Sequence, residues 1–453
     1  MGGIRGQRMS GNNKTGSAKV PSGRAHRLLR FGGMATGIAG RVAGAGLVAL
    51  AGGQRPALAQ LLLTPQNTRA LADGLSHLRG AALKLGQMVS MDSGVVLPPE
   101  LSAILASLRD TAQPMPPKQL QMVLATEWGA GWRARFRRFD VRPFAAASIG
   151  QVHRAVGLDG TEMAIKVQYP GVRQSIDSDV DNMASLLRLP GLVPKDMDLA
   201  PLFAEAKRQL HAEADYLREA RYLAQFGQLL AGDTRFQVPR LITEFSTAQV
   251  LAMSYVPGVP IDDLGDAPQE QRSQVAAALV DLVLRELFVF GLMQTDPNLA
   301  NYRYNRETGR IVLLDFGATQ PIAPALVAQF RALAGVALGG NAGQTRAALL
   351  RMGYMGPDTA AHHQALIQQM FELATAPLRQ EAVFDFGTSD LPERLRDMGL
   401  AIGTERDLAH VPPPETLFVH RKIGGMYLLA RSLGAKLALR PMIAPHATGP
   451  GAV

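Results

Sequence analysis

Three polar side chains, carried by two short segments, restrict most strongly what this chain can fold into. Asp296 and Asn301 stand five positions apart in the proline-containing segment Gln294-Thr-Asp-Pro-Asn-Leu-Ala-Asn301. Asp315 comes directly after the apolar run Ile311–Leu314, which is typical of a buried strand. The pattern predicts two adjacent loops that present metal-binding or proton-accepting side chains.

Such a set suits phosphoryl transfer. A loop Asp, a loop Asn and a strand-end Asp can share the tasks of positioning the nucleophile and holding Mg²⁺. Protein kinases use a loop Asp, an Asn five residues later and then Asp-Phe-Gly, but the His-Arg pair before the first Asp is missing in Gln294-Thr295-Asp296. Asp-Phe-Gly alone more often marks a strand followed by a turn, so the prediction depends on the whole set.

The composition fits a folded protein of two or three units. The chain has 453 residues, of which 47% are hydrophobic and 19% charged. The absence of cysteine excludes disulfides and thiolate metal sites and agrees with a reducing compartment. The net charge of +9 could suit nucleic acid, an anionic membrane surface or a nucleotide.

Residues 1–57 are predicted to be a basic flexible tail followed by a Gly/Ala-rich segment. The basic side chains of the first 30 residues meet no acidic residue, which is typical of a solvated tail with weak attraction to lipid headgroups. No apolar region and cleavage site follow promptly, so no secretory signal is expected. In Phe31–Gly53, Arg41 favours a close-packed or interfacial segment over a membrane span.

Residues 131–258 are predicted to form a first lobe around a sheet. Lys166, in the strand Met163–Val167, matches the third-strand lysine whose amine pairs with nucleotide phosphates. The small-residue loop Ala145–Ser148 would then cover the phosphates. Its Cβ atoms restrict the backbone where ordinary kinases have glycine.

The remaining segments are predicted to be mainly helical, with a hinge at Pro257-Gly258. We expect a helical extension over residues 58–130, helices at Ile176–Leu189, Leu199–Leu229 and Val275–Phe290, a mostly helical second lobe over 259–440 with loops at Phe384–Gly387 and Val411–Glu415, and a flexible tail over 441–453.

Several motifs occur in one order along the chain and together indicate a family. They are Lys84-Leu-Gly-Gln87, Ala145–Ser148, Ala-Ile-Lys166, Glu213-Ala-Asp215, Gln294-Thr-Asp-Pro-Asn298 and Asp315-Phe-Gly317. Over roughly residues 60–440 the chain resembles the UbiB/ADCK (AarF-domain) atypical kinase family. The stretches Met293–Asn298, Phe384–Thr388, Val411–Pro414 and His420–Gly425 resemble its coenzyme Q branch, found in mitochondria and alphaproteobacteria.

The resemblance implies an α+β, protein-kinase-like fold of two lobes, with a helical N-terminal extension folded across the place where a protein substrate would lie. ATP and Mg²⁺ are the implied cofactors. Lys166 would bind the α/β-phosphates, Asp296 would be the catalytic-loop acid, and Asn301 and Asp315 would hold the metal. The other expected nucleotide-site residues are Lys84, Gln87, Ala145, Ala146, Ala147, Ser148, Glu213, Asp215, Met253 and Tyr255. Lys84 and Gln87 are expected to meet Glu213 and Asp215.

The resemblance also implies an ATPase or phosphotransferase that supports ubiquinone biosynthesis. Quinone-precursor lipids, a membrane surface and ubiquinone-biosynthesis proteins are the implied partners; a homodimer is left open, and no nucleic acid is expected. The expected location is the bacterial cytoplasm, with peripheral attachment to the inner membrane as an option.

One position departs from the family pattern. Close relatives place the glutamate that pairs with the lysine one helical turn before Glu-x-Asp, and this chain has Gln209 there. A neutral amide cannot form that ion pair, so Glu205 or Glu213 is expected to substitute.

Two alternatives remain open. A pseudokinase scaffold would bind nucleotide and switch partner proteins without turnover. An aminoglycoside- or choline-type small-molecule kinase would share the loops but would have no use for the Lys84–Gln87 segment.

Overall fold

The computed structural model describes residues 37, 40, 41, 44, 64, 84, 114–187, 200–404 and 413–447. The predicted basic tail, Gln87, and Phe31–Gly53 apart from four positions lie outside the described residues. None of the helices in the described part of the chain combines the length and apolar character that a bilayer crossing requires.

The smaller lobe is built on an antiparallel sheet. Its strands are β1 (Phe136–Phe139), β3 (Gly150–Gly157), β4 (Glu162–Gln168) and β6 (Val250–Ser254) in the order β1-β3-β4-β6, and β2 (Ala145–Ala147) pairs with β3. Helix α6 (Pro117–Trp128) packs on this sheet through a buried core that includes Leu124 and Trp132. The predicted loop at Ala145–Ser148 is therefore wrong for its alanines, which form a hairpin strand.

Three helices follow β4 along the chain. They are α7 (Val172–Leu187), α8 (Ala200–Glu213) and α9 (Tyr216–Leu229). The helix predicted over Leu199–Leu229 is interrupted at Ala214-Asp215, because the Asp215 carboxylate caps α9 by accepting a hydrogen bond from the Arg218 N–H at 2.9 Å. The new helix start sets which side chains of α9 turn inward, and Tyr216, Glu219, Leu223 and Phe226 are buried.

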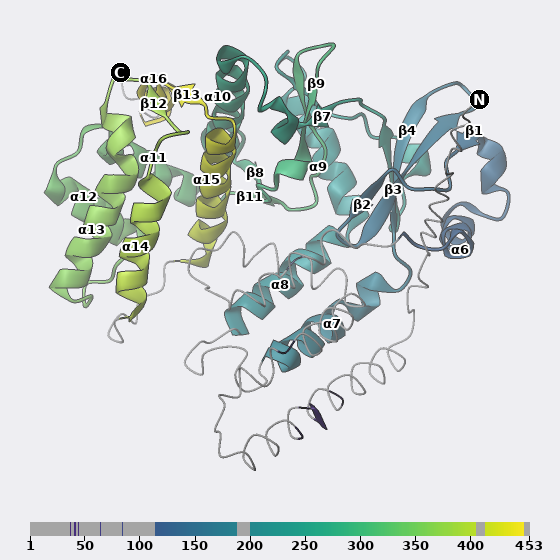
Figure 1. Cartoon of the computed structure of the whole chain (residues 1–453), viewed down its shortest axis with the longest axis horizontal. Helices are drawn as coiled ribbons and strands as arrows, with labels where there is room; N and C mark the ends of the chain where they lie inside the picture. Colours follow the sequence, from purple (N-terminus) through teal and green to yellow (C-terminus); the bar gives the residue numbers. More distant parts are fainter. Residues whose placement is uncertain are drawn as a thin grey trace, which may run out of the picture.

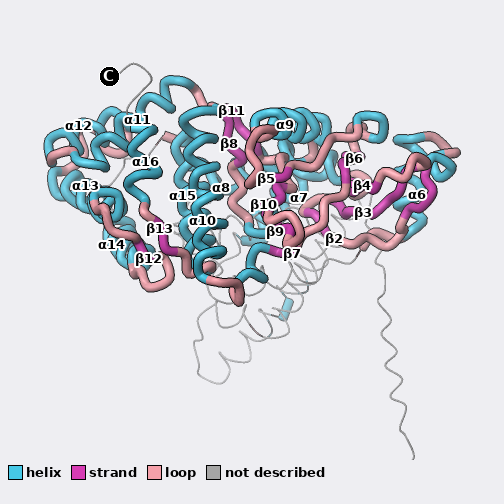
Figure 2. Tube along the Cα trace, turned by 90° about the horizontal axis from the view of Figure 1, so that it is seen from above, coloured by secondary structure: helices cyan, strands magenta, loops and turns pink. Residues whose placement is uncertain are grey.

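The predicted loop segments lie at short strands in the centre of the molecule (Figures 1 and 2). Strands β5 (Phe236–Gln237), β10 (Arg310–Leu313), β9 (Tyr302–Asn305) and β7 (Val259–Pro260) form one sheet, and β8 (Leu292–Gln294) pairs with β11 (Thr319–Pro321). Helix α10 (Gln269–Arg285) continues into a π-helical turn, Glu286–Phe290, directly before β8. The segment between β8 and β9 carries Asp296 and Asn301, and Asp315 follows β10.

The larger lobe is mainly helical. Its helices are α11 (Pro324–Gly339), α12 (Ala342–Met352), α13 (Ala361–Thr375), α14 (Leu391–Thr404), α15 (Pro414–Ser432) and α16 (Leu439–Ala447). Two sequence expectations are corrected here. Phe384-Asp385 forms strand β12, paired with β13 (Lys436–Leu437), and the tail predicted from residue 441 is helical up to Ala447.

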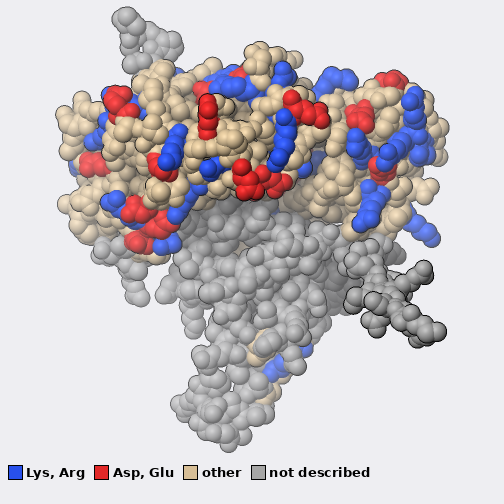
Figure 3. All heavy atoms as spheres, turned by 45° about the horizontal axis from the view of Figure 1, so that its top comes forward, with Lys and Arg blue, Asp and Glu red and all other residues tan. Residues whose placement is uncertain are grey.

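Acidic and basic side chains are interspersed over the face of the molecule seen in Figure 3. This agrees with the sequence, in which much of the net charge of +9 comes from the first 30 residues, which contain basic but no acidic side chains.

Candidate nucleotide site

Lys166 is the centre of a buried ion-pair cluster that joins the two lobes. It lies on β4, and its Nζ donates to both carboxylate oxygens of Glu219, at 2.8 and 3.0 Å, and to Asp315 Oδ2 at 3.3 Å. The ammonium also lies 5.2 Å from the centroid of the Tyr216 ring. Burial lowers the pKa of Lys166, but Asp315 and Glu219 raise it by more, so this pKa lies well above its usual value and the amine is charged.

The partner of this lysine is not one of the two glutamates expected from the sequence. Glu205 accepts hydrogen bonds from Arg208 and from Gln209 Nε2, and Glu213 pairs with Lys84. The helix is interrupted between α8 and α9, and α9 starts with a new orientation of its side chains. Glu219 of α9 is therefore the glutamate that points toward Lys166, and it is 1% exposed. The expected substitution by Glu205 or Glu213 is therefore wrong. The signal in the sequence was the capping Asp215, which restarts the helical register.

Asp315 occupies a tight turn at the mouth of the cluster. Its Oδ1 accepts the Gly317 N–H at 2.9 Å, and its side chain is 34% exposed. Burial raises the pKa of Asp315, but Lys166 and the Gly317 N–H lower it by more. The pKa of this carboxyl therefore lies below its usual value, and the group is ionised. Arg218 of α9 donates to the main-chain oxygens of Gly317, at 2.7 Å, and of Thr319. Sequence reasoning did not single out Arg218, which ties this turn to the helix that carries Glu219.

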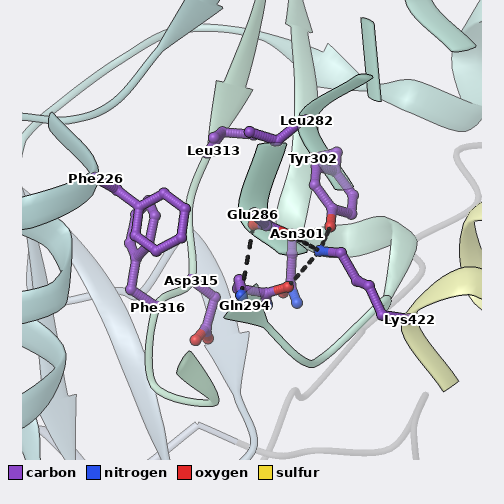
Figure 4. A pocket seen from close by; sticks show the side chains of 10 residues that line it. All are labelled: Phe226, Leu282, Glu286, Gln294, Asn301, Tyr302, Leu313, Asp315, Phe316 and Lys422. Carbon is purple, nitrogen blue, oxygen red and sulfur yellow. Dashed lines mark hydrogen bonds and ion pairs between the residues drawn. The ribbon is translucent and has the colours of Figure 1, made fainter. Parts of the chain in front are cut away.

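The loop of Asp296 and Asn301 lies next to the Asp315 turn. Asn301 Nδ2 donates to the Asp296 main-chain oxygen at 3.2 Å, and the Leu314 N–H donates to the Asn301 main-chain oxygen at 3.0 Å. The second bond fastens the end of β10 to the loop. Asn301 and Asp315 line one small cavity, as Figure 4 shows.

Glu213, the last residue of α8, contacts both the alanine hairpin and Lys84 of the N-terminal extension. Ser148 Oγ donates to Glu213 Oε2, and Lys84 Nζ lies 2.5 Å from Glu213 Oε1. Lys84 is 3% exposed, and burial, which lowers its pKa, is outweighed by Glu213 and Asp296, which raise it. Lys84 therefore meets Glu213, whereas Asp215 is engaged as a helix cap and Gln87 lies outside the described residues.

Met253 and Tyr255 stand at the end of the sheet nearest the hinge. Met253 is 6% exposed and pairs across the sheet with Ala164. The Tyr255 ring lies 4.2 Å from the Arg154 guanidinium carbon and 5.9 Å from the Phe144 ring. Their contact with a nucleotide stays a prediction.

The side chains beside the cavity fit a magnesium ion. Mg²⁺ prefers oxygen ligands and is usually held by one or two carboxylates together with substrate phosphates. Asp315 supplies a partly exposed carboxylate. The Asn301 side-chain nitrogen donates to the Asp296 main-chain oxygen, so the amide oxygen is the atom that Asn301 can offer to a cation. Within the described residues, no group of three or more His, Cys, Asp and Glu side chains could hold a metal alone.

The fold and this cluster define a protein-kinase-like nucleotide site, in which a strand lysine faces a helix glutamate and an Asp-Phe-Gly turn. The ABC1 atypical kinase-like domain matches residues 107–345, and the chain belongs to that family. The atypical kinase COQ8, mitochondrial, of Saccharomyces cerevisiae is 37% identical over 425 residues, which cover 93% of this chain and 84% of that protein. The atypical kinase COQ8B, mitochondrial, of Rattus norvegicus is 35% identical, over 95% of this chain and 82% of its own.

A solved structure has the same fold. Rv3197 from Mycobacterium tuberculosis, solved in complex with erythromycin, superposes on this chain with a TM-score of 0.58 at 24% identity. The match covers 84% of this chain and 95% of the Rv3197 chain. The expected α+β, protein-kinase-like fold is confirmed, and with the family it implies binding of a nucleotide and a metal.

One expectation is overturned by the relatives. The bacterial cytoplasmic location, with peripheral attachment to an inner membrane, is wrong on these findings, because the COQ8 proteins that this chain matches are mitochondrial.

Proposed function

We propose that the protein is an ATP-dependent phosphotransferase or ATPase of the atypical kinase type that works with Mg²⁺. The observation that carries the proposal is the buried Lys166, held between Glu219 and Asp315 next to the loop of Asp296 and Asn301. A charged amine fixed on an internal strand of a sheet, opposite an ionised and partly exposed carboxylate, suits a metal-bound triphosphate.

Each side chain has a distinct task in this proposal. Lys166 binds the α/β-phosphates, and Glu219 holds its amine in place. Asp315 and Asn301 hold Mg²⁺, which would neutralise the charge on the transferred phosphoryl group. Asp296 orients the attacking oxygen and accepts its proton. The hairpin of Ala145, Ala146, Ala147 and Ser148 covers the phosphates, and Met253 and Tyr255 contact the rest of the nucleotide.

The family and the COQ8 relatives connect the protein with ubiquinone biosynthesis. Within that setting we propose quinone-precursor lipids at a membrane surface, and the proteins of the pathway, as its partners. Lys84 supports a substrate other than a protein, since this side chain from the N-terminal extension reaches Glu213 beside the site. A homodimer is compatible with this proposal and is not required by it.

The second candidate is a pseudokinase scaffold that binds nucleotide without turnover. The contacts of Ser148 and Lys84 with Glu213 favour it, because they hold the hairpin and the extension together over the site. A small-molecule kinase is less well supported, because it has no role for the Lys84–Glu213 pair.

Turnover by wild-type protein and the Asp296→Asn variant separates these candidates. Release of inorganic phosphate from Mg²⁺-ATP would be measured with phospholipid vesicles and a quinone-precursor mimic present, and nucleotide affinity would be measured in parallel. An enzyme should lose about 100-fold or more in turnover while its nucleotide affinity changes little, because Asp296 acts on the nucleophile. Equal, background-level hydrolysis by both proteins, with nucleotide still bound, would leave only the scaffold.

A further inference from the structure

A second lysine is buried as deeply as any charged group in the described part of the chain. Lys422, on α15, is 1% exposed. An unpaired ammonium in such a place is strongly destabilising. Its surroundings must therefore compensate the charge.

The partners of Lys422 come from both ends of the catalytic loop, as Figure 4 shows. Its Nζ donates to Gln294 Oε1 at 3.0 Å and to the Tyr302 hydroxyl at 2.8 Å, and it lies 3.4 Å from Glu286 Oε2. Gln294 ends β8 directly before the loop, and Tyr302 begins β9 directly after Asn301. Two hydrogen bonds and one ion pair thus surround this ammonium group.

Glu286 provides the opposite charge from the helix that precedes the loop. It lies in the π-helical turn after α10, is 1% exposed, and its Oε1 accepts the Gln294 N–H at 3.4 Å. Burial lowers the pKa of Lys422, but Glu286 and Tyr302 raise it by more, so the amine is charged. The π-helical turn, both strand ends and α15 are thus held by a single cation.

This cluster lies at the same small cavity as the residues proposed to hold the metal. Lys422, Glu286 and Gln294 line the same cavity as Asn301 and Asp315. Gln294 also stands where the protein-kinase pattern has the histidine of His-Arg-Asp. The residue that replaces the histidine, Gln294, is therefore held by Lys422 of the distant helix α15.

We propose that Lys422 is a positioning residue that fixes the loop of Asp296 and Asn301 by holding Gln294 and Tyr302 at its two ends. The inference rests on the proposed function, since the loop it fixes is the one assigned to orient the nucleophile and hold the metal. A cation can hold both strand ends only if its charge is balanced, which is the task of Glu286. The alternative is that the cluster only stabilises the lobe.

The test removes the charges of Lys422 and Glu286 together, so that an effect on the placement of the loop can be told apart from a loss of stability. Replacing a buried ion pair by apolar side chains of similar volume is often neutral for stability, so the full-length Lys422→Met/Glu286→Leu variant should unfold cooperatively. We expect its kcat for Mg²⁺-ATP to fall about 10- to 100-fold, because the loop loses its exact placement, while KM for ATP stays within about twofold. Amide hydrogen exchange over residues 294–301 should become faster.

The matched control is Arg431→Met on the same helix. Arg431 pairs with Glu393 at 2.7 Å, with side chains 34% and 43% exposed, and its loss should leave kcat and loop exchange unchanged. If the double variant fails to fold, Gln294→Met removes one anchor while the Lys422–Glu286 pair remains, and it should give the same selective fall in kcat.

Wild-type kcat and wild-type loop exchange in the folded double variant, or in Gln294→Met if only that variant folds, would overturn the inference and leave the proposed function intact. If the wild-type protein itself has no turnover, the proposed function fails. The exchange rates of residues 294–301 then decide the inference alone: faster exchange supports it, and unchanged exchange overturns it.

Discussion

The chain contains two Asp-Phe-Gly turns that are alike in local geometry and differ in their surroundings. In each, the glycine N–H donates to the aspartate Oδ1 at 2.9 Å, for Gly317 to Asp315 and for Gly387 to Asp385. In each the phenylalanine is buried, and the aspartate meets a lysine, Lys166 at 3.3 Å or Lys436 at 3.1 Å.

The difference lies in what each lysine touches next. Lys166 has a side chain 11% exposed and also pairs with the buried Glu219. Lys436 is 52% exposed, and its pair with Asp385 closes the short ladder of β12 and β13. The first turn is joined to a second carboxylate, a helix and a neighbouring loop, whereas the second fastens two strands at the surface.

The comparison shows which information the triplet itself carries. Asp-Phe-Gly specifies a turn in which the aspartate caps the glycine N–H and the phenylalanine is buried. The chemistry that we propose for Asp315 comes from the residues that converge on it. Two pairs of variants test how far the two turns differ, and a third tests the glutamate that joins the first turn to α9.

The largest expected difference is in stability. Lys166→Met leaves the buried Glu219 without its cation, which should cost about 3–5 kcal/mol of the free energy of unfolding. Lys436→Met removes an exposed partner and should leave this free energy unchanged within error. Equilibrium urea unfolding of both variants measures the difference. Similar losses would mean that the two lysines play equivalent structural roles.

The next difference is in turnover. Asp315→Asn removes a charge assigned to hold the metal and should lower kcat for Mg²⁺-ATP about 100- to 1000-fold. Asp385→Asn changes the same atom in the same local turn and should keep wild-type kcat. Steady-state phosphate release measures both variants at saturating Mg²⁺. Comparable losses at the two positions would contradict the assignment of the metal to Asp315.

The parts of the site that the sequence could predict are those set by local pattern. The apolar run at Ile311–Leu314 predicted a strand before Asp315, and the strand around Lys166 was also correct, because alternation and turn residues act over a few positions. The alanine hairpin was assigned to a loop because its small side chains carry little strand signal.

The parts that could not be predicted depend on register or on distant contacts. The glutamate partner was missed because the cap at Asp215 restarts the helix and moves the inward position to Glu219. Lys422 lies 128 positions from Gln294, and no local periodicity relates two residues so far apart. A buried lysine in an amphipathic helix looks like any surface lysine until its partners are placed in space.

The smallest expected difference concerns that glutamate and tests the corrected partner directly. Glu219→Gln keeps the size of the side chain but removes the charge beside Lys166, so the lysine is held less firmly and kcat/KM for ATP should fall about tenfold. Glu205→Gln on α8 is the matched control. Its carboxylate is engaged by Arg208 and Gln209, so kcat/KM should stay within about twofold of wild type. A larger loss at Glu205 than at Glu219 would restore the pairing first expected from the sequence. It would also mean that α8, and not α9, positions the lysine when nucleotide is bound.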